Sequence, residues 1–287
     1  MEEKRGRVDK AGLDDITLEY EVSGTGEPAV FIHGAFIADA FRPLVAEPSL
    51  AGRYRLITYH RRGYMGSSRT QGPISVAQQA ADCRELLRHL GVEQVHMVGH
   101  SSGGCVALQF ALDFPEVVHS LALLEPALMV GVSAQAYRES LVKGEQRYRE
   151  AGAAVVADEF LKARWPGYRS ALDHMLPGGF AQAVANARAT FELDIGLLDW
   201  HFGEAEVRRI TQPVLVVLGG GSVDLSPRFE ETYWFLLDRL PHAEGFVLPG
   251  TTHFLHLETP AASRGMGEAL ADFWARHPLQ QPGVIPT

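Results

Sequence analysis

Short runs of apolar residues recur along the chain, separated by stretches with helical patterns. The first run alternates loosely between apolar and polar residues, whereas runs such as 29–32 and 118–124 are largely apolar, as in parallel strands buried on both faces. The expected strands are residues 16–22, 29–32, 54–59, 94–98, 118–124, 213–218 and 245–248. Helices are expected between them, at residues 75–90, 102–113, 228–240 and 260–276. This alternation predicts βαβ units and hence an α/β protein with a mostly parallel central sheet flanked by helices.

One long stretch interrupts the alternation of strands and helices. From about residue 129 to residue 208 no strong strand pattern occurs, and residues 134–151, 152–164 and 179–193 have helical patterns. The strand pattern returns at residue 213. The sequence therefore predicts a helical insert within the α/β fold.

Composition and charge narrow the class of protein. The chain has 287 residues, of which 46% are hydrophobic and 21% charged, as in a globular protein with one large core and a smaller insert. The formal net charge is −9. This charge argues against nucleic acid as a partner, and it slightly favours neutral or cationic substrates.

The two cysteines, Cys83 and Cys105, are too few for a disulfide framework, and both fall in segments with helical patterns. We therefore expect buried thiols in a reducing compartment. The first residues lack the apolar stretch of a signal peptide, and no apolar run reaches the length of a membrane span. The sequence predicts a cytoplasmic protein with no membrane partner.

The segment Gly99-His100-Ser101-Ser102-Gly103 lies where a predicted strand meets a predicted helix. In this setting G-x-S-x-G forms a nucleophile elbow, a tight turn that holds the central serine in a strained, exposed position. Glycine on each side avoids the collisions that a larger side chain would cause. The simpler alternative is a glycine-rich turn without chemistry.

With a His33-Gly34 turn after an earlier strand and the segment 250–258 near the end, this motif resembles the α/β-hydrolase fold superfamily. The resemblance covers about residues 15–277. It implies a member with a serine nucleophile and a helical cap inserted after the sixth strand. The implied domains are a core of residues 1–128 and 209–287 and a cap of residues 129–208.

The resemblance also implies a triad of serine, acid and histidine. Ser101 is the expected nucleophile, and a serine hydroxyl needs a base within hydrogen-bond reach. His253 is the expected base, because it lies after the last strand, where the family carries its catalytic histidine. His256 is the nearest competitor and is expected to pack beneath the loop. A serine nucleophile disfavours the chemistry of haloalkane dehalogenases and epoxide hydrolases, in which a carboxylate attacks carbon.

Two residues compete for the place of the acid. The commoner family position follows the strand at 213–218, where Ser222 replaces the usual aspartate and Asp224 falls two residues late. Glu125 follows the strand at 118–124, at a position that some family members use instead. We expect Glu125 to be the acid and keep Asp224 as the alternative. Without a catalytic role, Glu125 would cap a neighbouring turn and Asp224 would cap a helix.

The oxyanion hole is expected to consist of the backbone N–H groups of Ala35 and Ser102. Ser102 stands at a helix N-terminus, where free N–H groups and the helix dipole favour negative charge. Ala35 is assigned by analogy with the family, and its neighbour Phe36 is the alternative. Many family members carry an aspartate at the start of a loop that here reads Tyr59-His60-Arg61-Arg62-Gly63-Tyr64, and we expect this departure to alter the rim of the pocket. The residues expected to line the substrate pocket are Phe36, His100, Trp165 and Phe254.

The function that the resemblance implies is that of a serine hydrolase. It would cleave a carboxylic ester or lactone through an acyl-enzyme intermediate, with no metal or organic cofactor. Hydrolysis of a C–C bond in a diketone-type substrate would use the same residues. A third hypothesis is a non-catalytic receptor for a small molecule, against which the intact triad residues argue. A homodimer through the cap or the terminal helix is compatible with the sequence.

Overall fold

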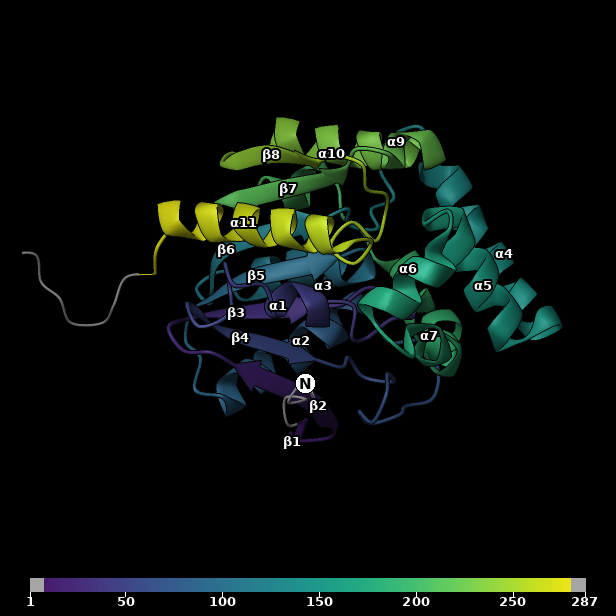
Figure 1. Cartoon of the computed structure of the whole chain (residues 1–287), viewed down its shortest axis with the longest axis horizontal. Helices are drawn as coiled ribbons and strands as arrows, with labels where there is room; N and C mark the ends of the chain where they lie inside the picture. Colours follow the sequence, from purple (N-terminus) through teal and green to yellow (C-terminus); the bar gives the residue numbers. More distant parts are fainter. Residues whose placement is uncertain (1–7, 280–287) are drawn as a thin grey trace, which may run out of the picture.

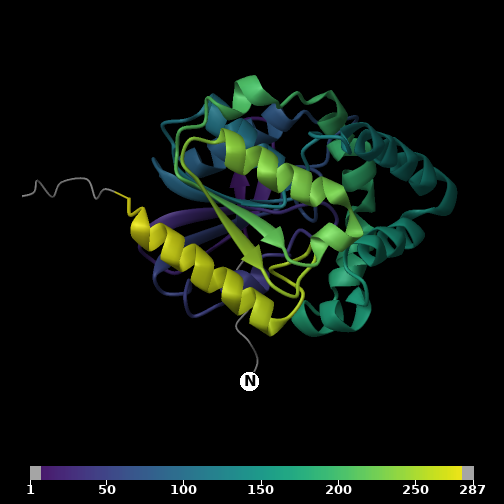
Figure 2. The ribbon, with the colours of Figure 1, turned by 90° about the horizontal axis from the view of Figure 1, so that it is seen from above.

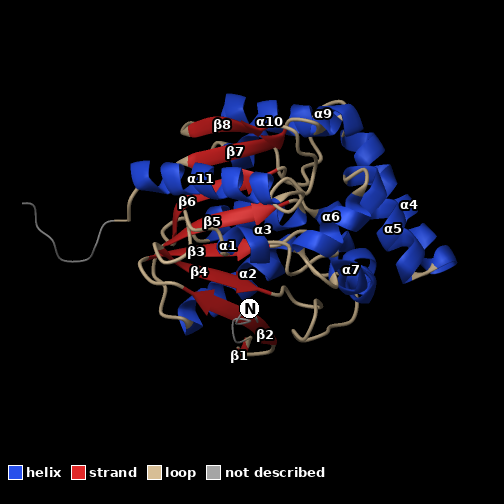
Figure 3. Ribbon diagram, viewed as in Figure 1, coloured by secondary structure: helices blue, strands red, loops and turns tan. Residues whose placement is uncertain are grey.

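The computed structural model describes residues 8–279. Its centre is an eight-stranded sheet in the order β1-β2-β4-β3-β5-β6-β7-β8 (Figure 1, Figure 3). The strands are β1 (Asp9–Gly12), β2 (Thr17–Ser23), β3 (Glu27–Ile32), β4 (Tyr54–Tyr59), β5 (Val95–His100), β6 (Val118–Leu124), β7 (Val214–Gly219) and β8 (Ala243–Leu248). β2 pairs antiparallel with both of its neighbours, β1 and β4. All other neighbouring strands of the sheet, from β4 to β8, are parallel. The mostly parallel α/β sheet expected from the sequence is confirmed.

Side chains of the parallel strands alternate between two hydrophobic cores, one on each face of the sheet. In β3, Val30 and Ile32 pack into one core, and Ala29 and Phe31 pack into the other. β5, β6 and β7 divide their side chains in the same way. Because both faces of these strands are buried, the sequence shows them as continuous apolar runs.

Within residues 8–279, the main helices that cover the two faces of the sheet are five. They are α1 (Arg42–Val45), α2 (Val76–His89), α3 (Ser102–Asp113), α10 (Pro227–Arg239) and α11 (Pro260–Arg276). The helices α2, α3 and α10 pack on one face, and α1 and α11 pack together on the other. Figure 2 shows β7 and β8 between α10 and α11. None of the helices within residues 8–279 is both long enough and apolar enough to cross a lipid bilayer.

Between β6 and β7 the described chain is helical and contains no strand. This helical segment comprises α4 (Ala134–Ala151), α5 (Ala153–Arg164), α6 (Tyr168–Met175), α7 (Gly179–Arg188), a π-turn (Ala189–Leu193), a 3-10 turn (Asp194–Asp199) and α8 (Glu204–Val207). The single helix expected over 179–193 is therefore divided after α7. The segment gathers beyond the ends toward which the parallel strands point (Figure 1, Figure 2). The expected boundaries of a separate cap domain stay a prediction.

The turn from β5 into α3 brings the helix very close to β3. An ideal Cβ on Gly103 would lie 2.2 Å from the carbonyl oxygen of Ile32, and one on Gly99 would lie 2.6 Å from the carbonyl oxygen of Gly103. Backbone atoms leave no room for either Cβ. The sequence expectation that this turn requires glycine is therefore confirmed at both positions.

Replacing Gly103 by alanine is expected to lower the free energy of unfolding by about 1–3 kcal/mol, because the added methyl group meets the backbone of β3. This loss of stability outweighs the gain from the higher helix propensity of alanine. Chemical denaturation measures the change in the free energy of unfolding. Gly12→Ala is the matched control, since nothing lies within 4 Å of its added Cβ. A Gly103→Ala protein as stable as wild type would contradict the close approach.

Candidate active site

Ser101 occupies the turn between β5 and α3 in a strained conformation, with φ 53° and ψ −122°. Positive φ is unusual for a residue with a side chain. The backbone after β6 fixes the turn: the Ser101 N–H donates to Leu124 O at 3.0 Å, and the Ala127 N–H donates to Ser101 O at 3.0 Å. The Ser101 side chain lines a cavity.

A chain of hydrogen bonds links Ser101 to two side chains from neighbouring loops. Ser101 Oγ lies 3.1 Å from Nε2 of His253, which follows β8. His253 Nδ1 lies 2.7 Å from Oε2 of Glu125, which follows β6. The other carboxylate oxygen of Glu125 accepts the Gly219 N–H at 2.8 Å. The C-terminal ends of β5, β6 and β8 thus bring three side chains that are distant in sequence into one line.

Asp224 lies elsewhere. It is exposed on α9 (Ser222–Leu225) and makes no hydrogen bond to His253, whose Nδ1 is occupied by Glu125. Ser222, which stands in place of the usual aspartate, is fully buried. Of the two acids that the sequence offered, the structure brings Glu125 to the histidine and leaves Asp224 facing solvent.

Burial determines the protonation of this chain of side chains. Burial raises the pKa of Glu125 to about 7, although the charge of Arg228 nearby favours the carboxylate. Burial, followed by the positive charges of Arg228 and Arg164, holds the pKa of His253 well below its usual value. The imidazole is therefore neutral at neutral pH. A neutral imidazole that accepts a hydrogen bond from Ser101 can take up its proton.

Two backbone N–H groups beside Ser101 are available to an anion. Ala35 and Ser102 both line the cavity, and within residues 8–279 neither N–H donates to a protein acceptor. The N–H of Phe36 donates to Thr190 Oγ1 at 3.1 Å and is therefore engaged. The geometry favours the expected pair of donors over the alternative at Phe36.

The cavity beside Ser101 has a volume of about 270 Å³. α4, α5 and the two turns that follow α7 supply most of its wall, which is largely apolar. The lining residues are Ala35, Ser101, Ser102, Ala127, Tyr137, Ser140, Leu141, Gly144, Arg147, Val156, Glu159, Phe160, Arg164, Thr190, Phe191, Asp194, Ile195 and Leu197. A cavity of this kind can bind a small organic molecule against the serine hydroxyl.

The four side chains expected to line the pocket are absent from this wall, and that expectation is corrected. Phe36 is fully buried, and Trp165 stacks on Phe254 with ring centroids 5.8 Å apart. His100 Nε2 donates to the carbonyl oxygen of His253 at 2.8 Å. These residues support the site from within the core. Aromatic residues both line pockets and pack beneath them, so residue type alone could not distinguish the two roles.

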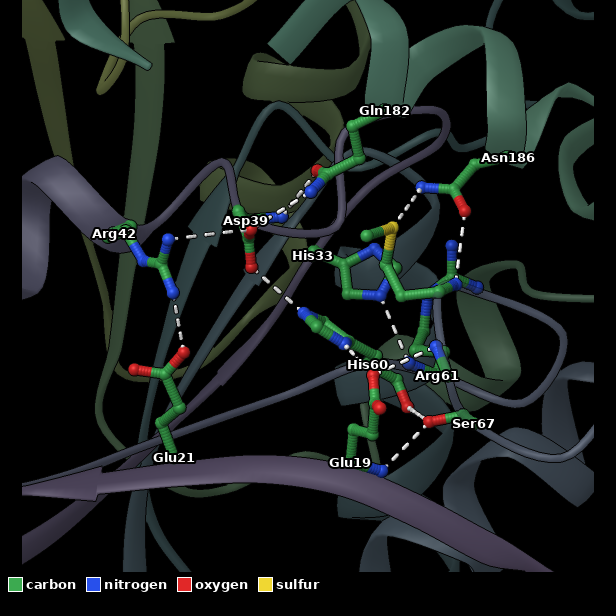
Figure 4. A network of polar contacts seen from close by, with 12 residues as sticks. Glu19, Glu21, His33, Asp39, Arg42, His60, Arg61, Ser67, Gln182 and Asn186 are labelled. Atoms are coloured by element: carbon green, nitrogen blue, oxygen red, sulfur yellow. Dashed lines mark hydrogen bonds and ion pairs between the residues drawn. The ribbon is translucent and has the colours of Figure 1, made fainter. Parts of the chain in front are cut away.

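His33 and Arg61 brace the loop that carries Ala35. The Arg61 N–H donates to His33 Nε2 at 3.0 Å, so the proton on His33 Nδ1 is free to donate to Gly34 O at 2.7 Å (Figure 4). The buried Arg61 guanidinium donates to Gly34 O at 3.1 Å and to Ser102 Oγ at 3.2 Å. A single arginine thus holds Gly34, which precedes Ala35, and Ser102, which carries the other free N–H group.

Asp194 of the helical segment balances the charge of Arg61. Its two carboxylate oxygens accept from the Arg61 guanidinium at 3.0 and 2.8 Å, and the Tyr64 hydroxyl donates to it at 2.6 Å. Both charged groups are buried. This ion pair connects the sheet and its loops to the helical segment.

His60 lies between two carboxylates, outside the cavity wall (Figure 4). Its ring nitrogens lie 3.0 Å from Glu19 Oε2 and 2.8 Å from Asp39 Oδ1. Burial opposes the charged ring, but these two carboxylates outweigh it and raise the pKa of His60. Asp39 in turn binds the side-chain amide of Gln182 on α7. His60 therefore joins α7 to the core through Asp39, and its side chain does not line the cavity.

Two arginines near the cavity were missed by the sequence analysis. Arg164 ends α5 and lines the wall, and Arg228 lies in the first turn of α10. An arginine at a helix C-terminus is common, so the sequence around Arg164 did not indicate a functional role. An arginine in the first turn opposes the helix dipole, which is the one feature that could have singled out Arg228.

The remaining histidine and cysteine candidates are packed in the core. His256 is fully buried and stacks on Phe41 with ring centroids 4.4 Å apart, as expected. Cys83 and Cys105 are free, buried thiols. Over residues 8–279, no three His, Cys, Asp or Glu side chains are grouped so that they could hold a metal ion.

A family model described as "alpha/beta hydrolase fold" matches residues 28–260. The chain is 38% identical over 118 residues to a fluoroacetate dehalogenase from Burkholderia sp., a match that covers 39% of this chain and 38% of that protein. It is 31% identical over 116 residues to a soluble epoxide hydrolase from Corynebacterium sp., covering 40% of each. The matches thus span about two-fifths of the length of these curated relatives.

Solved structures match over nearly the whole chain. A thermophilic esterase from Thermogutta terrifontis has a TM-score of 0.76 at 21% identity, covering 93% of this chain and 99% of that one. An enol-lactonase from Burkholderia xenovorans LB400 has a TM-score of 0.76 at 19% identity, covering 93% and 100%. At these identities the matches concern the fold.

Asp194→Asn is expected to lower the free energy of unfolding by about 3 kcal/mol, because it leaves the Arg61 guanidinium buried without its counter-charge. Chemical denaturation measures the change. Glu159→Gln is the matched control: it makes the same chemical change in an ion pair with Arg147 that is half exposed, and it should have little effect. Equal effects of the two substitutions would show that the buried pair is not important for stability.

Proposed function

The chain belongs to the alpha/beta hydrolase fold family, and on this premise we propose that it is a serine hydrolase that cleaves a carboxylic ester or lactone. The observation that carries the proposal is the hydrogen-bonded line from Ser101 Oγ through His253 to Glu125. A nucleophile, a base and an orienting acid in that order are what acyl transfer to serine requires.

In the first half of the reaction, Ser101 Oγ forms a bond to the substrate carbonyl carbon while its proton passes to His253 Nε2. The carbonyl oxygen becomes an oxyanion, which the N–H groups of Ala35 and Ser102 stabilise. The proton on His253 then passes to the alkoxide as the C–O bond breaks. An acyl-enzyme on Ser101 remains, and the alcohol is released or, for a lactone, stays attached to the acyl group.

In the second half, water replaces the alcohol. His253 Nε2 removes a proton from the water as its oxygen attacks the acyl carbon, and the same proton returns to Ser101 Oγ as the acid is released. Glu125 keeps the proton on Nδ1 throughout, so that Nε2 remains the acceptor, and its charge stabilises the imidazolium that forms in each half.

The nucleophile separates this chain from two of the relatives that it resembles. Dehalogenation and epoxide opening by attack at carbon use a carboxylate, whereas this chain places a serine hydroxyl at the elbow. The base beside it is neutral and the two N–H groups nearby suit an oxyanion. These features support attack on a carbonyl group, as in the esterase and the enol-lactonase whose folds are similar.

Ser101→Ala and Glu125→Gln are each expected to reduce kcat for p-nitrophenyl acetate by about 10⁴-fold or more, because the members of such a triad act as a unit. Asp224→Asn is the matched control and should retain the wild-type rate, since Asp224 faces solvent. Circular dichroism checks that each variant is folded. If Asp224→Asn lost activity while Glu125→Gln kept it, the assignment of the acid would be wrong.

The rate should depend on pH through Glu125 and His253. The reactive form has an ionised Glu125 and a neutral His253, and burial raises the pKa of Glu125 to about 7. Activity on a neutral ester should therefore rise through about pH 7, level off above it and be lost in acid. Stopped-flow or initial-rate measurements of kcat/KM between pH 5 and pH 9 give the profile.

Arg228→Met should move the acidic limb of this profile to higher pH. The charge of Arg228 favours the deprotonated forms of both Glu125 and His253, so its removal lets them bind protons more readily. Arg209→Met removes an exposed charge far from both groups in the sequence and serves as the control. An acidic limb that stays in place in Arg228→Met would contradict the electrostatic argument.

A further inference from the structure

Arg164 faces the cavity without a carboxylate partner among the described residues. Its guanidinium lies 3.7 Å from the ring centroid of Phe160, and its hydrogen bond to Phe160 O is long, at 3.4 Å. Burial and the nearby charge of Arg228 lower the pKa of Arg164 to about 10, so the side chain is still charged at neutral pH. A cation therefore lines the same cavity as Ser101.

Arg228 adds a second positive charge next to this wall. Its side chain is 6% exposed, and its Nη1 has no hydrogen-bond partner. The guanidinium lies 3.8 Å from the ring centroid of Phe229 and 4.3 Å from that of Tyr137, which lines the cavity. The two arginines are close enough for the charge of Arg228 to lower the pKa of Arg164.

Arg228 is buried and Arg164 is partly exposed at the cavity, whereas the two other buried arginines of the described chain are neutralised. Arg61 is paired with Asp194 and Arg62 with Asp82, in each case through two hydrogen bonds to the carboxylate. A charge removed from water without a counter-charge is unfavourable, and natural proteins seldom keep one without a purpose. Within residues 8–279, neither Arg164 nor Arg228 forms an ion pair with a carboxylate, although the charge of Arg228 acts on Glu125.

The carboxylates nearest the cavity are already engaged. Glu125 binds His253 and the Gly219 N–H. Asp194 binds Arg61, and Glu159 binds Arg147 through two hydrogen bonds where the wall meets solvent. Within residues 8–279, no carboxylate is therefore left to pair with Arg164.

The backbone of Arg164 is tied to the loop that carries His253. Its carbonyl oxygen accepts the His253 N–H at 3.3 Å and the Thr252 hydroxyl at 2.9 Å. The end of α5 and the base are thus held together. The backbone from which the Arg164 side chain extends is therefore held in place relative to His253.

We propose that the substrate carries a free carboxylate, which the Arg164 guanidinium binds while Ser101 attacks an ester or lactone carbonyl in the same molecule. This inference rests on the proposed function and narrows its substrates to half-esters of dicarboxylic acids and lactones that bear a carboxylate. Arg228 contributes its charge through the electrostatic field at the wall. The net charge of the chain pointed to neutral or cationic substrates, but the local charge at the cavity is positive.

Hydrolysis of two esters that share one scissile bond tests the inference. Monomethyl glutarate carries a carboxylate, and dimethyl glutarate does not. Wild type should prefer the monoester, and Arg164→Met should lower kcat/KM for it by about 10- to 100-fold, the range for a hydrogen bond to a charged group. The same variant should hydrolyse the diester nearly as fast as wild type.

Two further variants separate charge from packing. Arg169→Met removes an exposed arginine that does not line the cavity and whose charge Asp158 balances, so the preference for the monoester should persist. Arg164→Lys keeps the charge but loses the fork of donors, and it should restore part of the preference. If Arg164→Met and Arg169→Met had the same effect on the preference for the monoester, the inference would be overturned.

Binding to Ser101→Ala distinguishes this inference from the proposed function, because it requires no turnover. Calorimetry should show that Ser101→Ala binds monomethyl glutarate at least about tenfold more tightly than dimethyl glutarate, and that adding Arg164→Met removes the difference. If this difference in binding were found but wild type hydrolysed neither ester, the proposed hydrolase function would be refuted and the carboxylate site would stand. If wild type hydrolysed both esters with equal kcat/KM and Ser101→Ala bound both equally, the proposed hydrolase function would stand and the carboxylate site at Arg164 would be refuted.

Discussion

Glu125 holds a carboxylate in the interior of the protein, where a charge is stable only if hydrogen bonds replace the water it has lost. The His253 Nδ1–H and the Gly219 N–H supply those bonds, and each comes from a different strand end. The carboxylate therefore determines which nitrogen of His253 carries the proton, and so which nitrogen faces Ser101. If this acid were displaced, the serine would remain in its turn but would lose its acceptor.

Backbone strain is concentrated around the same place. Within residues 8–279, the non-glycine residues with positive φ are Phe36, Met65, Ser101 and Glu125. Ser101 and Glu125 belong to the hydrogen-bonded line, and Phe36 follows Ala35. Asn186 of α7 binds the other two, through Phe36 O at 2.9 Å and the Met65 N–H at 3.1 Å. Unfavourable conformations of this kind persist only where surrounding contacts enforce them, and here the helical segment provides part of that enforcement.

The sequence predicted the parts of the molecule that local rules control. Continuous apolar runs gave the parallel strands, and the elbow with its glycines located Ser101. The substitution of Ser222 for an expected aspartate pointed to Glu125. The strand β1 was missed because Asp9–Gly12 is short and scarcely apolar. The cavity wall was missed for a different reason, since whether an aromatic ring lines a cavity or packs under it depends on tertiary contacts. The lack of a carboxylate partner for Arg164 likewise cannot be predicted from the sequence, because it depends on the position of every nearby carboxylate in the folded protein.

The hydrogen bonds from the His253 loop to the end of α5 have a consequence for how a substrate arrives. If the helical segment lifted as a whole, it would withdraw the carbonyl oxygen of Arg164 from His253 and Thr252 and would separate Asp194 from Arg61. The exposed pair between Arg147 on α4 and Glu159 on α5, by contrast, can part without disturbing any of these groups. A molecule that enters between those two helices would pass a pair of opposite charges first and reach the serine with the reacting groups already assembled.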